Sequence, residues 1–152
     1  AHMNHFRPGL PVAMLVFSRI PIALLRAGFP LGRLYLLDTP GRRTGALRTV
    51  PIVIFRHDGR RWLVSIFGET GWVANIRAAG TARLRRGRRV ETIRCTEVTD
   101  GRRAEVAMQL RRTFSARINP FVRGAFEATP RDGLEAFQAE EHRHPVFLVD
   151  AD

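Results

Sequence analysis

The feature that most restricts the fold of this chain is a tight turn at residues 57–60, with the sequence HDGR, between two segments of alternating apolar residues. An Asp-Gly pair accepts positive φ at low cost, as a two-residue hairpin turn requires. Residues 47–56 before the turn and 61–67 after it have the period of two that is typical of half-buried strands, and so do residues 33–38. Strands that follow one another through short turns predict an antiparallel sheet or a small barrel.

The rest of the sequence adds helices to this sheet. Further strands are expected at residues 82–86, 89–98 and 146–149, and helices at residues 72–79, 102–114 and about 133–141. Gly80 ends the first helix, Thr99 or Asp100 caps the second, and Asp132 caps the third. Residues 118–129 have the composition of a loop. These elements predict an α+β fold with helices outside the sheet.

The length of 152 residues suits one domain, which we assign to residues 4–152. Residues 1–3 are interpreted as the remnant of an expression tag. Residues 10–29 are the most apolar part of the chain and are expected to form a helix packed on the core. Arg19 and Pro21 interrupt them, so the segment falls short of the roughly 20 apolar residues that a transmembrane helix needs. Peripheral contact of this helix with a membrane, or closure over an active site, stays open.

The chain is strongly basic, with a formal net charge of +11 and 25 basic residues that are all arginine. Such a positive field favours anionic ligands, nucleic acid or acidic membrane surfaces, and it does not choose among them. The one cysteine, Cys95, excludes an internal disulfide and a cysteine-rich zinc site. Because nothing indicates an oxidising compartment, a cytoplasmic location is expected.

Two further polar groups are interpreted as structural. His142 and His144 lack the spacing and the third ligand of a metal site, so a surface cluster near a helix end is expected and no metal is predicted. The densest basic run consists of Arg83, Arg85, Arg86, Arg88 and Arg89. Because this run contains no aromatic residue on which bases could stack, it is expected to be the solvated face of a hairpin.

The stretch from Thr39 to Pro51, TPGRRTGALRTVP, has more hydrogen-bond donors than a turn needs. Gly41 and Gly45 allow successive backbone N–H groups to turn inward around an anion. Arg42 and Arg43 add planar, permanently charged groups that suit phosphate or carboxylate. Neither a Walker loop nor a dinucleotide-binding fingerprint is present. These residues alone leave two alternatives open, an anion site and a solvated turn.

Two blocks of sequence resemble the deazaflavin-dependent nitroreductase family, which belongs to the flavin/deazaflavin oxidoreductases. The first block is T-x-G-R-R-T-G-x-x-R-T-V-P at residues 39–51, and the second is G-E-T-G-W-V-x-N-I-R-A-A-G at residues 68–80. The resemblance runs from about residue 34 to residue 149. It implies an FMN-binding split barrel-like fold, which is an antiparallel split β-barrel with flanking helices. It also implies the cofactor coenzyme F420, whose phospholactate and oligoglutamate tail is anionic.

The same resemblance implies where the cofactor binds. Arg42 and Arg43 match the basic pair that holds the cofactor phosphate, with Thr44 beside them. Arg48 is expected to point at the ring or the tail. The other matching residues are Thr49, Val50 and Pro51, on the strand against which the ring lies, and Gly68, Trp72 and Asn75, which shape the phosphate end and the ribityl region. For Trp72 and Asn75 a purely structural role, as a helix anchor and a turn-binding amide, stays open.

The implied reaction is hydride transfer between the deazaflavin and an apolar, electron-poor acceptor such as a quinone, a nitroaromatic compound or an enone. The protein needs only to hold the donor and acceptor carbons in near-attack geometry, so no catalytic side chain is assigned. Some relatives carry tyrosines near the ring, whereas the single tyrosine here is Tyr35, which makes nitroimidazole reduction the less expected reaction.

Two alternatives to this function stay open. One is a split barrel that binds FMN, FAD or haem, and the other, ranked lower, is a basic nucleic-acid-binding module without catalysis. The expected partner is a small-molecule acceptor and not nucleic acid, and a homodimer is left open.

Overall fold

Seven strands form one antiparallel sheet in the computed structural model, which describes residues 34–113 and 125–152. The strands are β1 (Leu34–Pro40), β2 (Leu47–Val53), β3 (Phe55–His57), β4 (Arg60–Val64), β5 (Thr81–Arg86), β6 (Arg89–Val98) and β7 (Val146–Ala151). Their order across the sheet is β2-β1-β5-β6-β7-β4-β3. The helix expected at residues 10–29 lies outside the described residues.

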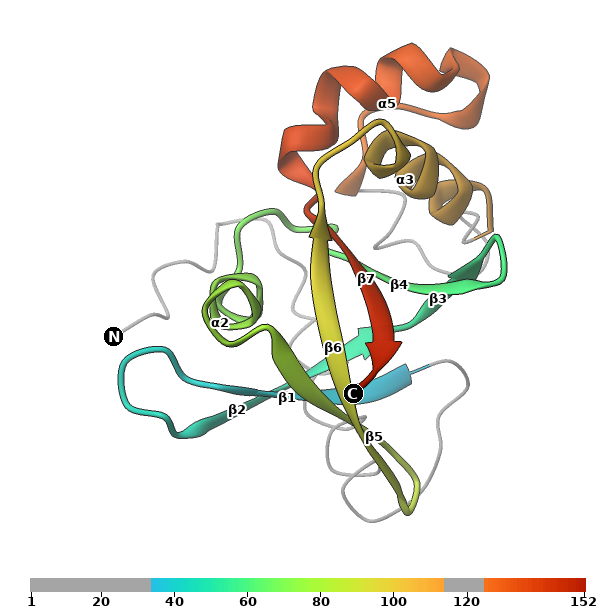
Figure 1. Cartoon of the computed structure of the whole chain (residues 1–152). Helices are drawn as coiled ribbons and strands as arrows, with labels where there is room; N and C mark the ends of the chain where they lie inside the picture. Colours follow the sequence, from blue (N-terminus) through green and yellow to red (C-terminus); the bar gives the residue numbers. More distant parts are fainter. Residues whose placement is uncertain (1–33, 114–124) are drawn as a thin grey trace, which may run out of the picture.

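The two edge strands of this sheet, β2 and β3, are consecutive in the chain and are separated only by Ile54. A sheet whose opposite edges are joined by one residue must curl until those edges come close, and Figure 1 shows this curled, barrel-like sheet. The expectation of one strand over residues 47–56 is therefore wrong. At Ile54, which is buried, the chain leaves its pairing with β1 and begins its pairing with β4.

The hairpin turn between β3 and β4 is confirmed. His57 and Arg60 are paired across it, and the two residues between them, Asp58 and Gly59, have φ values of 56° and 70°. Both lie in the left-handed region, which the tight turn requires and which Asp-Gly adopts at low cost.

Strand β4 ends at Val64, before the expected limit at residue 67. The reason lies in Ser65, whose N–H donates to the carbonyl of Pro145 and whose hydroxyl donates to the carbonyl of Gly68. The first bond extends the β4–β7 pairing by one residue, and the second folds the chain back on itself into the loop that precedes the next helix.

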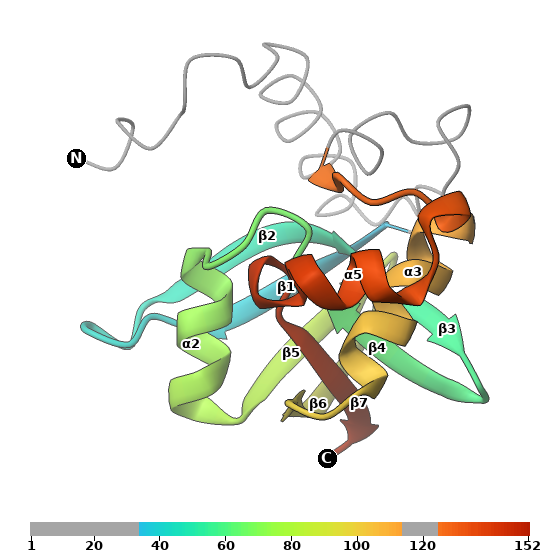
Figure 2. The ribbon, with the colours of Figure 1, turned by 90° about the horizontal axis from the view of Figure 1, so that it is seen from above.

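Three helices that the structure describes in full are α2 (Gly71–Ala79), α3 (Arg102–Thr113) and α5 (Leu134–Glu140), with short 3-10 turns η2 (Pro130–Asp132) and η3 (Glu141–Arg143). Helices α3 and α5 lie side by side at one end of the sheet, and α2 lies apart from them, against β1 and β5 (Figures 1 and 2). Asp100 caps α3, because its Oδ1 accepts the N–H of Arg102 at 3.0 Å. Within the described ranges, the helices are too short or too polar to cross a bilayer.

Asp132 does not cap α5, which corrects the sequence-based expectation. Its Oδ2 accepts hydrogen bonds from the backbone N–H of Thr129 at 2.7 Å and from the Thr129 hydroxyl at 3.0 Å. These bonds form the capping box of η2, and Gly133 separates that turn from α5. The expected loop at residues 118–129 is described only from residue 125 onward.

Two clusters of buried apolar side chains hold these elements together. One joins β1 and β4–β7 to α2, and it consists of Leu37, Ile54, Leu63, Val73, Ile76, Ala82, Leu84, Ile93, Cys95, Phe147 and Val149. The other joins the sheet to α3 and α5, and it consists of Phe55, Trp62, Val98, Ala104, Val106, Ala107, Leu110, Phe126, Ala128, Phe137 and Val146. Because Cys95 is buried in the first cluster, the pKa of its thiol is raised to about 12.

Candidate functional site

The turn between β1 and β2 is closed by its own backbone. The N–H of Gly41 donates to the carbonyl of Ala46 at 2.8 Å, and the N–H of Gly45 donates to the carbonyl of Gly41 at 2.8 Å. The Thr44 hydroxyl accepts the N–H of Ala46 at 3.3 Å. These bonds fix the backbone of a turn whose arginine side chains are exposed.

Side chains of this turn converge on Gly41. A Cβ at that position would lie 3.0 Å from the Ala46 carbonyl oxygen, 3.5 Å from the Thr44 hydroxyl and 3.8 Å from Nε of Arg48. Arg48 stands on β2, so a guanidinium from the strand lies beside Gly41, the first residue of the turn. Only the Ala46 carbonyl comes too close for a side chain at Gly41, whereas the Thr44 hydroxyl and the Arg48 guanidinium lie at ordinary contact distance beside it, and both are suitable donors for an anion.

Asn75 connects this turn to α2. Its Oδ1 accepts two bonds from Arg42, from the backbone N–H and from Nη1, both at 3.3 Å. Its Nδ2 donates to the hydroxyl of Thr39 at 3.1 Å. Asn75 is 3% exposed and Thr39 is fully buried. One buried amide therefore brings together the two sequence blocks, residues 39–51 and 68–80, that are far apart in the chain.

Three arginines of the first block carry charges that the described residues do not neutralise. Arg42, Arg43 and Arg48 are exposed, and no carboxylate in the described part of the chain lies within ion-pairing distance of them. Guanidinium groups stay protonated at any physiological pH. The turn thus presents permanent positive charge to solvent, as an anion site requires.

The strand that follows the turn is fixed to a buried carboxylate that the sequence did not point to. Asp38 on β1, 1% exposed, accepts the Thr49 hydroxyl at 2.7 Å. It also accepts Nε of Arg83 at 3.2 Å and Nε and Nη2 of Arg85 at 2.7 and 2.9 Å. Burial by itself would raise the pKa of the Asp38 carboxyl, but the bonds from Arg85 and Thr49, the Arg85 charge and the Arg83 bond together hold that pKa below its usual value.

The two arginines of this network correct the expectation of a wholly solvated basic hairpin. Arg83 and Arg85 on β5 are bound to Asp38, although Arg83 is still exposed, whereas Arg88 and Arg89 are exposed without an ion pair to any described residue. The alternation of side chains along a strand explains the arrangement. Thr39 points to α2, so its neighbour Asp38 points to the other face of the sheet, where Arg83 is its cross-strand partner.

The remaining predicted residues lie on β2 and around the start of α2. Val50 and Pro51 are half-buried and pair with Leu37 and Leu36 of β1. Trp72 is half-buried in the first turn of α2, and its ring packs against Phe147, with centroids 5.9 Å apart. This contact makes Trp72 an anchor of the helix, which is the structural role left open above.

Gly68 lies in the loop between β4 and α2. It has a φ of 83°, and its carbonyl accepts hydrogen bonds from the Ser65 hydroxyl and from the Thr70 N–H. The loop that carries this second-block glycine is therefore fixed at its N-terminal half by Ser65.

The two histidines near the end of α5 are not a surface cluster. His142 is exposed, but His144 is 2% exposed and its Nε2 lies 3.2 Å from Oε2 of buried Glu140. Glu140 also accepts the backbone N–H groups of Glu127 and Ala128. The pair is structural, since it ties α5 to the segment before η2. The described residues contain no cluster of histidine, cysteine, aspartate and glutamate that could hold a metal ion.

A cavity of about 530 Å³ lies between the C-terminal half of α2 and β6. Its lining includes Ile76, Arg77, Arg94, Glu97 and Phe147 and none of the ten predicted cofactor residues. The predicted site is therefore separate from this cavity and lies at the exposed tip of the β1–β2 turn and along β2.

Comparison with known proteins identifies the family. The model of the F420H(2)-dependent quinone reductase family matches residues 24–119, which is more than half of the chain. The chain belongs to this family. It is therefore an enzyme, an F420-dependent reductase that transfers hydride to quinone-like, small-molecule acceptors. The expected relation to F420-dependent reductases is confirmed, and the family implies F420 as the cofactor. No curated protein matches the chain.

Solved structures show that this quinone reductase family member has the split-barrel fold. An F420-H2-dependent reductase, FDR-A, is 19% identical with a TM-score of 0.50, and the match covers 80% of this chain and 97% of that chain. A protein described as a domain-swapped dimer is 17% identical with a TM-score of 0.51, over 91% and 98% of the two chains. A putative pyridoxamine 5′-phosphate oxidase from Listeria innocua is 8% identical with a TM-score of 0.51, over 87% and 90%.

Proposed function

We propose that this enzyme binds reduced F420 along the β1–β2 turn and β2, and that it reduces quinones there. The observation that carries the proposal is the group of three exposed arginines, Arg42, Arg43 and Arg48, whose charges no described carboxylate neutralises. The Thr44 hydroxyl and Nε of Arg48 lie on the same side of this turn, next to Gly41. These donors fit the phosphate and the carboxylates of the F420 tail.

In this proposal Arg42 and Arg43 hold the cofactor phosphate, and Thr44 donates its hydroxyl. The Asn75 amide supports the clamp, because it accepts both the backbone N–H and Nη1 of Arg42. An arginine that is already held in place loses less side-chain entropy when an anion binds. Arg48 binds the tail or the ring from the strand side.

The segment Thr49–Pro51 is proposed as the surface on which the deazaflavin ring lies. Thr49 is fixed through its hydroxyl to Asp38, and Pro51 has no N–H and a fixed φ, so this part of β2 has little freedom to move. When bound, the reduced deazaflavin supplies the hydride. The protein has to hold ring and acceptor within about 3.5 Å and to exclude water, and no dedicated acid is needed.

Several finer features belong to the same proposal. A single domain over residues 4–152 carries the activity, with the apolar segment 10–29 as a roof of the acceptor pocket or a contact with a membrane surface. Nitroaromatic compounds and enones are further acceptors. The protein works in the cytoplasm, and the domain-swapped dimer among its structural neighbours supports a homodimer.

The assay for this function follows the oxidation of reduced F420 with menadione as acceptor. We expect saturable turnover and tight binding of F420 to the purified protein. Arg42→Ala combined with Arg43→Ala should weaken F420 binding by roughly 3–6 kcal/mol, because each of the two charge-assisted contacts contributes about 1.5–3 kcal/mol. Folding should hardly change, since both side chains are exposed.

The matched control is Arg88→Ala combined with Arg89→Ala. This double variant removes the same formal charge from two exposed arginines of the β5–β6 hairpin, away from the proposed clamp. It should retain affinity within about 0.5 kcal/mol. Equal losses in the two double variants, measured by calorimetry, would mean that only the general positive field attracts the cofactor.

A further inference from the structure

The N-terminal end of α2 has no side-chain cap. Thr70 occupies the capping position, but its hydroxyl makes no capping bond and has no hydrogen-bond partner in the described part of the chain. The first turn of α2 also lacks an acidic residue. A helix start usually needs such partners, because its first N–H groups have no acceptors within the helix. Apart from the bonds that Ser65 and Thr70 make to the Gly68 carbonyl, no described side chain at the start of α2 itself holds the preceding loop to the helix.

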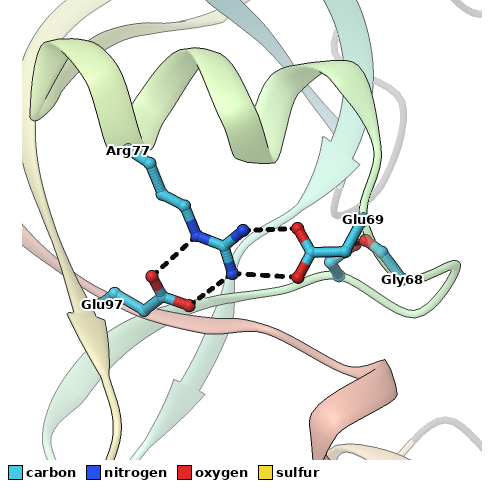
Figure 3. A network of polar contacts seen from close by, with 5 residues as sticks. Gly68, Glu69, Arg77 and Glu97 are labelled. Atoms are coloured by element: carbon cyan, nitrogen blue, oxygen red, sulfur yellow. Dashed lines mark hydrogen bonds and ion pairs between the residues drawn. The ribbon is translucent and has the colours of Figure 1, made fainter.

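Arg77, in the last turn of α2, makes that connection. Figure 3 shows its guanidinium between two carboxylates, Glu69 of the loop before the helix and Glu97 of β6. Nη1 and Nη2 bind the two oxygens of Glu69, the latter at 3.0 Å, and Nε and Nη2 bind Glu97, both at 2.8 Å. One side chain thus joins the loop, the helix and the sheet.

The helix that Arg77 holds is also the one that carries Asn75. That amide lies two residues before Arg77 and braces Arg42 in the β1–β2 turn. The loop before α2, which Arg77 binds through Glu69, also carries Gly68. Trp72 stands in the first turn of the helix. A shift of α2 relative to β6 would displace all three of these second-block residues at once.

We propose that Arg77 is a positioning residue for cofactor binding, which holds α2 and its preceding loop so that Asn75 can brace the phosphate clamp. This role rests on the proposed function of the β1–β2 turn. Arg77 itself lies on the side of α2 that borders the cavity next to β6, and it is not part of the proposed phosphate clamp. Its action passes through Glu69, Glu97 and the helix.

Arginine is required at this position because of its geometry. Its planar group donates in pairs to both carboxylates, whereas a lysine ammonium is a point charge that cannot make two bidentate contacts. The network is partly exposed, with 38% of the Arg77 side chain accessible to solvent, so it adds little to global stability. The effect of losing it should therefore appear in binding before it appears in folding.

The experiment compares the full chain with Arg77→Lys and Arg77→Gln, using F420 binding and steady-state oxidation of reduced F420 by menadione. We expect Kd and KM for F420 to rise about tenfold, which is a typical size for coupling between linked sites. We expect kcat to stay within about twofold and Tm to change by no more than about 2 °C. If Arg77 had a purely structural role, its variants would lower Tm, and KM would not rise selectively while kcat stayed unchanged.

Glu69→Gln provides a second test of the same role. If Arg77 acts through the loop, Glu69→Gln should weaken F420 binding to a similar extent, and the double variant Arg77→Lys, Glu69→Gln should lose no more than either single variant. The control is Arg94→Gln, which removes an arginine of β6 whose only ion pair in the described residues is an exposed one with Asp152. It should leave affinity unchanged.

The outcomes separate this inference from the proposed function. A wild-type protein that does not bind F420 overturns the proposed function, and the role of Arg77 with it. A wild-type protein that binds F420, together with Arg77 variants of unchanged affinity, overturns the role of Arg77 alone. Additive losses for Arg77→Lys and Glu69→Gln would also contradict it, because the two residues would then act independently.

Discussion

Asp38 shows what one buried carboxylate does for this protein at the scale of a single residue. It is 1% exposed, and it accepts hydrogen bonds from Thr49, Arg83 and Arg85, which come from the strands on both sides of β1. A buried charge is tolerated only when such partners are present. The network therefore fixes β2 and β5 to β1 directly beside the proposed ring surface.

We predict that Asp38→Asn lowers the free energy of unfolding by roughly 1.5–3 kcal/mol, the usual worth of hydrogen bonds to a charged group. Asparagine keeps the shape but leaves the Arg85 charge without its counter-ion. Urea unfolding at neutral pH measures the difference. The control is Asp152→Asn, whose carboxylate forms, among the described residues, only an exposed ion pair with Arg94 and should contribute about 0–1 kcal/mol. Equal losses for the two variants would contradict the prediction.

Gly41 is a residue whose lack of a side chain shapes the site. We predict that Gly41→Ala costs about 1–3 kcal/mol of stability and weakens F420 binding, because its Cβ would lie 3.0 Å from the Ala46 carbonyl and force the turn to open. Gly101→Ala is the matched control, since nothing lies within 4 Å of a Cβ at that exposed position. Thermal unfolding and F420 titration test both variants. If Gly41→Ala and Gly101→Ala behave alike, the contact between a Cβ at Gly41 and the Ala46 carbonyl does not control the turn.

At the scale of elements, the sequence predicts what depends on local chemistry. The bounds of β6, the left-handed turn at residues 57–60 and the helix over residues 72–79 follow from periodicity and turn residues, and the structure confirms them to within one or two residues. The division at Ile54 could not be read in this way. It depends on which strands become neighbours, and a continuous apolar run gives no information on that order.

The same distinction applies to the elements around the candidate site. The two blocks that carry it could be recognised, and the contact between them through Asn75 explains why they belong together. The partners of Asp38 could not be predicted, because Arg83 and Arg85 follow it by more than 40 residues on a strand whose pairing the sequence left open. His144 was wrongly placed on the surface, since its burial depends on how α5 packs.

At the scale of the whole molecule, the segment around His144 joins the α3–α5 end of the protein to the sheet. His144 packs against Phe126, with ring centroids 4.1 Å apart, and Pro145 next to it accepts the N–H of Ser65. Burial lowers the pKa of His144 below 6.5, and this effect exceeds the opposing influence of Glu140. The folded protein therefore holds this imidazole in its neutral form at neutral pH.

We predict that the protein loses stability as the pH falls from 7.5 to 5.5. Below pH 6.5 the unfolded chain binds a proton at His144 that the folded protein does not take up until its lowered pKa is reached. The loss for this one group is at most about 1.4 kcal/mol per pH unit. Urea unfolding at several pH values measures the slope, and His144→Gln should reduce it. An unchanged slope in that variant would contradict the assignment.

The burial of Cys95 has a consequence for an enzyme that handles quinones. Quinones are electrophiles that alkylate thiolates by conjugate addition, and the rate of such reactions depends on the thiolate fraction and on access to the sulfur. The chain has one cysteine, which is 7% exposed and has a pKa raised to about 12, so almost none of it is ionised at neutral pH. Burial and the raised pKa of this thiol should therefore protect the enzyme from covalent inactivation by its acceptor at cysteine.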